Sequence, residues 1–257
     1  MPSIIPIPAF ADNYIWLLEQ DGRTAVVDPG DAQPVLAYLQ GAGLKLDVVL
    51  ATHHHNDHVG GIPALLARFD VPVYGPANEQ IPSRTHAMRE GDRARLWDAV
   101  AFDVLDIPGH TAGHIAYTGT FGGDRVVFCG DTLFACGCGK LFEGTPPQMW
   151  SSLQKLAALP PETRVYCGHE YTMSNIRFAK MADPGNPVLV QREAREQAKR
   201  ARNEPTLPST IGDELATNPF LRADRPELRV TAQGHAGSPI RDAVASFAAL
   251  REWKNRA

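Results

Sequence analysis

The chain has 257 residues, of which 44% are hydrophobic and 21% are charged, and its net charge is −4 at pH 7. These values are ordinary for a globular protein large enough to bury a core without metals or disulfides, so any metal site is expected to serve chemistry. The small negative charge and the absence of a run of roughly 18 apolar residues argue against nucleic-acid and membrane partners, neither of which we expect.

Short β-branched runs separated by turns predict strands through the first two thirds of the chain. The predicted strands are Ile4–Ile7, Tyr14–Leu18, Thr24–Val27, Asp47–Ala51, Val71–Tyr74, Val100–Ile107, His114–Thr120, Arg125–Cys129 and Arg164–Cys167. The predicted helices are Pro34–Gly41, Ile62–Phe69 and Pro147–Leu159. Strands in a meander, followed by strands interleaved with helices, indicate sheets that are covered by helices on their outer faces.

The last third of the chain has a helical pattern. Helices are predicted over Tyr171–Lys180, Pro187–Asn203 and Ser238–Asn255, the last with apolar residues at three- and four-residue spacing. The stretch Arg192–Arg202 mixes charges of both signs, which is typical of a solvated helix face. We therefore expect a first domain over residues 1–169 and a helical second domain over 170–257.

The N-terminal segment and the cysteines bear on the compartment. The first twenty residues have no basic segment, and Pro6, Pro8 and Asp12 interrupt their apolar stretch, so a signal peptide is not expected. The cysteines show no disulfide framework, and they are Cys129, Cys136, Cys138 and Cys167. We expect a cytoplasmic protein with reduced thiols, and a monomer.

The segment THHHNDH (52–58) directly follows the predicted strand Asp47–Ala51 and holds four candidate metal ligands. His53 and His55 are two residues apart in an extended segment and can point to one side. Asp57 and His58 can turn towards a second point as the next helix begins. A surface histidine tract or a structural zinc clip is the alternative, but a structural site usually recruits cysteines. The segment therefore indicates a catalytic metal site.

Three further candidates each follow a predicted strand and a glycine. They are His110 in PGHT (108–111), Asp131 in CGDT (129–132) and His169 in CGHE (167–170). Glycine lets the backbone turn sharply beneath a crowded site. Three such coincidences after one histidine-rich segment favour a shared centre.

With DPG (28–30), HHHNDH, PGHT, GDT and GHE in this order, residues 1–170 resemble the metallo-β-lactamase superfamily. The resemblance implies an α+β fold, an αββα sandwich of two mixed sheets. It also implies two divalent metal ions per chain, for which zinc is expected and iron or manganese are alternatives. The implied ligands are His53, His55 and His110 for one ion, Asp57, His58 and His169 for the other, and Asp131 for both.

Three further features resemble the glyoxalase II (hydroxyacylglutathione hydrolase) family. The first is CGCGKLFEG (136–144), in which Lys140 matches a basic residue that contacts glutathione and Phe142 stands where some members have tyrosine. The second is GHEYT (168–172), in which Tyr171 matches a residue that lines the glutathione site. The third is the C-terminal pair Arg251 and Lys254, which can meet one anion from one helix face.

The implied reaction is hydrolysis of S-D-lactoylglutathione to glutathione and D-lactate, the second step of methylglyoxal detoxification. A hydroxide that bridges the two ions attacks the thioester carbonyl, with Asp57 and Asp131 as the catalytic carboxylates. A thiolate leaves readily because its conjugate acid has a pKa of about 8.5. The alternatives are another thioesterase or lactonase of the superfamily, a persulfide dioxygenase, or a metal-binding module without turnover.

The remaining histidines and cysteines are expected outside the metal centre. His54 should point away from its neighbours, and His114 should form a local hydrogen bond. Cys136 and Cys138 have no partner pair at metal-finger spacing, so they are interpreted as structural. Asp28 is expected to orient a ligand histidine.

Overall fold

The computed structural model describes residues 1–97 and 100–257, which form two compact units. The first unit consists of Met1–Asp106, Thr111–Gly130 and Tyr166–His169. The second unit consists of Ile107–His110, Asp131–Val165 and Glu170–Ala257.

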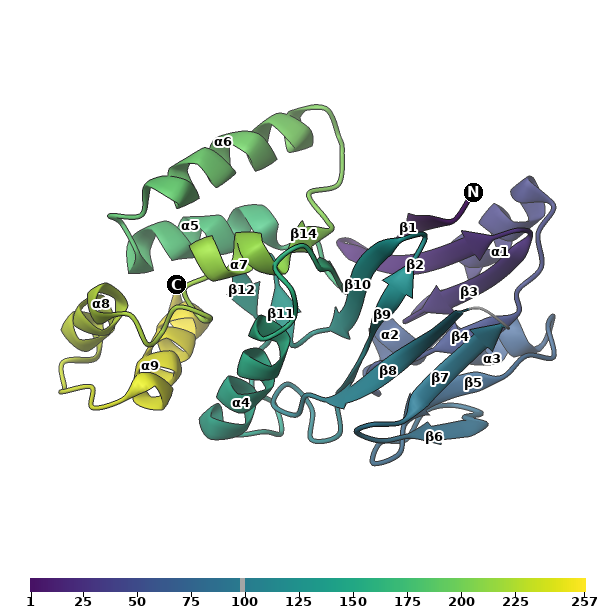
Figure 1. The fold of residues 1–257 in the computed structure, drawn as a ribbon, viewed down its shortest axis with the longest axis horizontal. Coiled ribbons are helices and arrows are strands. Elements are labelled where there is room, and N and C mark those ends of the chain that lie inside the picture. The colour runs from purple at the N-terminus through teal and green to yellow at the C-terminus, as the bar shows by residue number, and fades with distance from the viewer. Residues whose placement is uncertain (98–99) are drawn as a thin grey trace. The chain divides into compact units, whose positions relative to one another are not determined.

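The first sheet lies in the first unit and runs in the order β1-β2-β3-β4-β5-β6 (Figure 1). Its strands are β1 (Ser3–Ala9), β2 (Asn13–Gln20), β3 (Arg23–Val27), β4 (Val48–Leu50), β5 (Val73–Pro76) and β6 (His86–Met88). The pairs β1–β2 and β2–β3 are antiparallel, and the pairs from β3 to β6 are parallel, so the sheet is mixed.

Helices α1 (Ala32–Ala42) and α3 (Ile62–Leu66) cover one face of this sheet. Val35 and Leu39 of α1 and Leu65 of α3 are buried against Val26 and Val49 of the sheet. The short helix α2 (Asn56–Val59) connects β4 to α3. The parallel strands need such crossover connections, which explains why helices alternate with strands here.

The second sheet runs in the order β14-β13-β10-β9-β8-β7. Its strands are β7 (Arg93–Trp97), β8 (Val100–Asp106), β9 (Ile115–Phe121), β10 (Asp124–Gly130), β13 (Arg164–Cys167) and β14 (Ser209–Thr210). Aromatic rings fill the first unit between the two sheets. Trp16 of β2 lies edge-on to Tyr166 with ring centroids 4.9 Å apart and donates to the carbonyl oxygen of Cys167.

The second unit is mostly helical and carries one small hairpin, β11 (Leu133–Phe134) with β12 (Gly137–Cys138). Its helices are α4 (Pro146–Ala157), α5 (Thr172–Ala182), α6 (Pro187–Ala201), α7 (Ile211–Thr217), α8 (Pro226–Ala236) and α9 (Ala243–Arg256). Phe178, Phe220, Phe247 and Trp253 form its aromatic core. No helix within the described residues is long and apolar enough to span a membrane.

The predicted elements were found with shifted ends, such as α3, which ends at Leu66 instead of Phe69, and the second unit requires two further corrections. Helix α9 begins at Ala243 instead of Ser238, because the Asp242 side chain accepts from the Ala245 amide and caps the helix there. The stretch Arg192–Arg202 is not a solvated face throughout. Arg192 and Glu196 are only 2% and 1% exposed, because α6 packs its charged face against α7.

Candidate functional site

In the first unit, the loop after β4 places the histidine-rich segment at the end of a buried parallel strand. Both oxygens of the Asp28 carboxylate hold this loop, because the amide and the hydroxyl of Thr52 each donate to one of them at 2.7 Å. His55 is the extended N-cap of α2, so that Asp57 and His58 lie in the helix's single turn. A Cβ at Gly30 would lie 1.8 Å from the backbone oxygen of Asp57, so only glycine fits beside the loop.

One group of ligand atoms lies entirely in the first unit. Single ligand atoms of Asp57, His58 and His169 lie within 4.8 Å of one another. The Nε2 atoms of His169 and His58 are 3.5 Å and 3.6 Å from one oxygen of Asp57. Two imidazoles and one carboxylate are a donor set that zinc, iron and manganese accept, so these residues fit a divalent ion.

Polar partners orient each member of this group. The Asp28 carboxylate lies 3.1 Å from Nδ1 of His58, which confirms the expected orienting contact. Asp12 lies 2.8 Å from Nδ1 of His169, and the side-chain amide of Asn13 donates to Asp57 at 3.1 Å. The sequence reading missed Asp12 and Asn13. Both residues lie at the turn between β1 and β2, and the sequence around this turn does not indicate a contact with His169 or Asp57.

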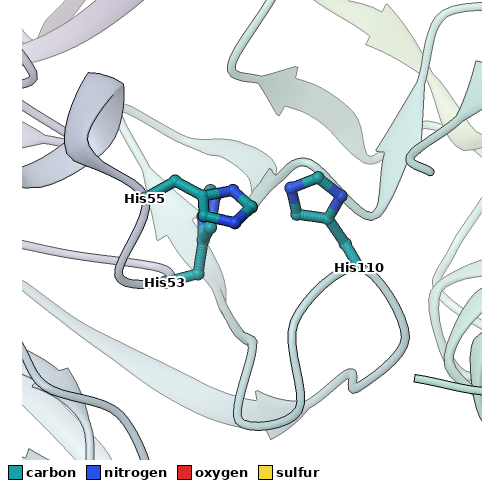
Figure 2. A group of neighbouring side chains, drawn as sticks. All are labelled: His53, His55 and His110. Atoms are coloured by element: carbon teal, nitrogen blue, oxygen red, sulfur yellow. The ribbon is translucent and has the colours of Figure 1, made fainter. Parts of the chain in front are cut away.

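His53 and His55 form the second candidate pair on the same loop. Nε2 of His53 and Nδ1 of His55 are 3.1 Å apart, and the ring of His53 stacks on His114 at 4.5 Å. Figure 2 shows these two side chains, which come from the loop after β4, with that of His110, which comes from the loop after β8 and belongs to the second unit. His114 contacts the Ile115 carbonyl through Nδ1, the local bond that was expected.

In the second unit, His110 and Asp131 lie side by side. Nε2 of His110 is 3.5 Å from an Asp131 carboxylate oxygen, and its Nδ1 is 2.9 Å from the backbone oxygen of Lys140. The carbonyl contact orients the ring with Nε2 towards Asp131. A Cβ at Gly139 would lie 1.9 Å from the Asp131 backbone oxygen and 3.0 Å from Nδ1 of His110, so this loop also requires glycine.

A cleft of about 360 Å³ opens in the second unit beside these two residues. All five residues predicted to bind substrate line it, together with His110 and Asp131. The five are Lys140, Phe142, Tyr171, Arg251 and Lys254. The structure therefore brings these five residues, which come from three separate segments, to one cleft, and their binding of substrate stays a prediction.

Arg251 and Lys254 are held in the cleft by uncharged acceptors. The buried Arg251 guanidinium donates to the backbone oxygen of Cys138 at 2.7 Å, and the Lys254 ammonium donates to the side-chain oxygen of Asn175. Burial, and then the charge of Arg251, lower the pKa of Lys254 from 10.5 to about 8. Because both acceptors are neutral, this end of the cleft has a net positive charge.

A buried charge network supports the hairpin that carries part of the lining. Glu214 on α7 is fully buried and pairs with Arg192 at 2.6 Å. Its other oxygen accepts from the Cys136 amide at 2.8 Å and from the Asn218 side chain at 2.9 Å. Asn218 also donates to Gly137 at 2.9 Å. Sequence reasoning did not find Glu214 or Asn218.

The residues that were expected outside the metal centre have other contacts. His54 lies 2.9 Å from Glu79, and His86 and His235 stack on Tyr74 and Trp253. All four cysteines are buried thiols. Burial raises the pKa of the Cys136 thiol to about 12, and that of Cys138 is raised for the same reason. These thiols are protonated near neutral pH, which agrees with a structural role.

Comparison with known proteins divides the chain into two matched segments. Residues 10–169 match the family model described as "Metallo-beta-lactamase superfamily", and residues 170–257 match "Hydroxyacylglutathione hydrolase C-terminus". The predicted fold class, a metallo-β-lactamase sandwich with a helical C-terminal segment, is thereby confirmed.

Relatives and solved structures extend this similarity to the whole chain. A hydroxyacylglutathione hydrolase of Alkalilimnicola ehrlichii is 55% identical over 259 residues, which cover 100% of each chain. One of Nitrosomonas eutropha is 53% identical over 256 residues, which cover 99% of each. The crystal structure of ETHE1 from Myxococcus xanthus has a TM-score of 0.66 at 26% identity and covers 99% of both chains. That of TTHA1623 in a di-iron-bound form has a TM-score of 0.58 at 28% identity and covers 85% of this chain and 99% of the other.

Proposed function

This chain belongs to the hydroxyacylglutathione hydrolase family of the metallo-β-lactamase superfamily, and we propose that it hydrolyses S-D-lactoylglutathione to glutathione and D-lactate. The reaction is the second step of methylglyoxal detoxification. The observation that carries the substrate assignment is the cleft of the second unit, in which Arg251 and Lys254 donate to uncharged acceptors, the backbone oxygen of Cys138 and the side-chain oxygen of Asn175. A peptide carboxylate supplies the charge that these acceptors lack.

We propose the following ligands for a pair of divalent ions. His53, His55 and His110 hold one ion, Asp57, His58 and His169 hold the other, and Asp131 contacts both. The convergence of Asp57, His58 and His169 supports the second set. Zinc is the proposed metal, and iron and manganese suit the same donors. When bound, such ions lower the pKa of water and polarise a thioester carbonyl.

The remaining roles, substrate binding and catalysis, are assigned to the following side chains. Arg251, Lys254 and Lys140 bind the carboxylates of glutathione, and Phe142 and Tyr171 pack against its peptide. Asp57 and Asp131 are the proposed catalytic carboxylates. A thiolate is a good leaving group, so hydrolysis needs no strong general acid.

We further propose that residues 1–169 form the catalytic domain and residues 170–257 form the glutathione-binding domain. The two family models meet between residues 169 and 170, which supports this division. We propose a cytoplasmic monomer, and the four reduced, buried thiols support the cytoplasmic location.

Initial rates on S-D-lactoylglutathione, measured with the metal content of the same sample, test the proposal. We expect turnover that chelation abolishes, and a KM that rises in Arg251→Ala and Lys254→Ala. Lys180→Ala is the matched control, because Lys180 is a half-exposed cation of the same unit that pairs with Glu193. If the fully metallated protein leaves the thioester intact, the substrate assignment is wrong, and lactones and persulfides are the next substrates to test.

A further inference from the structure

Glu79 is a buried carboxylate outside all the proposed ligand sets. It lies in the turn after β5, in the first unit, and its side chain is only 3% exposed. Arg84 fixes the backbone of this turn, since its guanidinium donates to the carbonyl oxygens of Pro76 and Glu79. Removing a carboxylate from water costs several kcal/mol unless donors compensate the charge.

The donors that compensate Glu79 come from two different loops. One carboxylate oxygen lies 2.9 Å from Nδ1 of His54. The other accepts from the hydroxyl of Thr111 and, at 3.0 Å, from the amide of Gly113. An ionised carboxylate only accepts, so Nδ1 of His54 carries the proton. A single buried side chain therefore ties the loop after β4 to the loop before β9.

Two of these three contacts are adjacent in sequence to a proposed metal ligand. His54 stands between His53 and His55, and Thr111 directly follows His110. The fit around Glu79 is also tight, because a Cβ at Gly113 would lie 2.7 Å from its Cγ. The carboxylate can move little without displacing the backbone beside these histidines.

We propose that Glu79 is a positioning residue for metal binding. It holds residues 53–55 through the His54 side chain and residues 111–113 through the Thr111 hydroxyl and the Gly113 amide, so that the histidines in or beside these segments keep the directions that a metal ion requires. The proposal rests on the proposed function only in taking His53, His55 and His110 as ligands. Groups that hydrogen-bond to a metal ligand commonly change metal affinity by about 10- to 100-fold when they are removed, and Glu79 acts on residues next to such ligands.

The test compares Glu79→Ala with the conservative Glu79→Gln. We expect Glu79→Ala to weaken zinc binding by about 10- to 100-fold and to lower kcat more than it changes KM. Glu79→Gln keeps an oxygen for Thr111 and Gly113, and its amide N–H can donate to His54 Nδ1 once the neutral imidazole carries its proton on Nε2 instead, so it should restore most of the affinity. Zinc affinity is measured by competition with a chromophoric chelator, and thermal unfolding is measured with and without zinc.

Asp47→Ala is the matched control for loss of a carboxylate that clamps a loop. Asp47 accepts from the Thr24 amide at 2.8 Å and from Arg23 at 2.9 Å, in the same unit. This variant should lose stability without losing zinc affinity. If Glu79→Ala does not fold, Thr111→Val removes one of the same contacts and should weaken zinc binding in the same direction.

Unchanged zinc affinity in a folded Glu79→Ala protein, or in Thr111→Val if Glu79→Ala does not fold, would overturn the positioning role. An equal loss in the Asp47→Ala control would do the same, because it would reduce the effect to general stability. The affinity is measured without substrate. If the thioesterase assignment is wrong, the wild-type protein binds zinc but does not hydrolyse S-D-lactoylglutathione. Failure of this proposal is therefore distinguishable from failure of that assignment.

Discussion

The low pKa of Lys254 predicts that substrate affinity falls above about pH 8. Burial is the main cause, and the neighbouring charges of Arg251 and Arg177 add to it. Cys138 and Cys136 oppose the shift. Both thiols have raised pKa values and stay neutral over most of this range. The lysine therefore loses its proton within an accessible pH range, while Arg251 remains charged.

The fall of the Lys254 pKa from 10.5 to about 8 corresponds to roughly 3 kcal/mol. The unfolded chain holds this proton more tightly than the folded protein. Stability therefore rises with pH between the two values and is lower below pH 8. Binding has the opposite sign, because a substrate carboxylate beside Lys254 favours the charged form. Above pH 8, affinity should fall by up to about tenfold for each pH unit.

The assay is inhibition by S-methylglutathione, which has no ionisable thiol, from about pH 7 to about pH 9.5. The inhibition constant of the wild type should rise in the upper part of this range. Lys254→Arg keeps its charge at every pH and should show a smaller rise. Lys254→Met should bind weakly throughout. Identical pH profiles for the wild type and Lys254→Arg would refute the reasoning, since they would assign the pH dependence to another group.

Two further predictions concern groups that support the cleft. Glu214→Gln leaves the buried Arg192 charge without its partner, so urea unfolding should show a loss of about 3–5 kcal/mol. Gly139→Ala places a methyl group 1.9 Å from the Asp131 backbone oxygen, so kcat should fall by about 100-fold as the loop shifts.

Each of these variants has a matched control in the second unit. Lys180→Ala breaks an exposed ion pair and should cost less than about 1 kcal/mol. Gly234→Ala, in α8, meets nothing within 4 Å and should leave kcat unchanged. The packing argument is contradicted if Glu214→Gln is as stable as Lys180→Ala. It is also contradicted if Gly139→Ala has the same kcat as Gly234→Ala.

The strands and the candidate ligands were predictable because their signals are local. A buried parallel strand is a short apolar run. In this chain the candidate ligands that follow such strands are histidines and aspartates, and a glycine stands where the loop is crowded. Gly30 and Gly139 show this crowding directly, since a Cβ at either would lie within 2 Å of a backbone atom. The residue type and its position directly after a strand are therefore enough to predict these elements and candidate ligands.

The supporting contacts were not predictable in this way because they join distant parts of the sequence. Asp12 and His169 are 157 residues apart, and Glu214 is 78 residues from Cys136, whose amide donates to its carboxylate. An aspartate in a turn and a glutamate in a short helix are both ordinary surface residues. Only the fold shows that each is the partner of a site residue.

The same reasoning explains why the mixed-charge stretch of α6 was misread. Alternating signs at helical spacing favour solvent exposure only if no other element competes for the face. Here Glu214 of α7, 22 residues further along the chain, takes Arg192 into the interior. That carboxylate also holds the hairpin backbone at Cys136. A buried arginine of this helix therefore helps to shape the cleft of the second unit through a glutamate, and its conservative replacement by lysine would lose the guanidinium's bonds to Thr217 and to the Asp213 carbonyl oxygen.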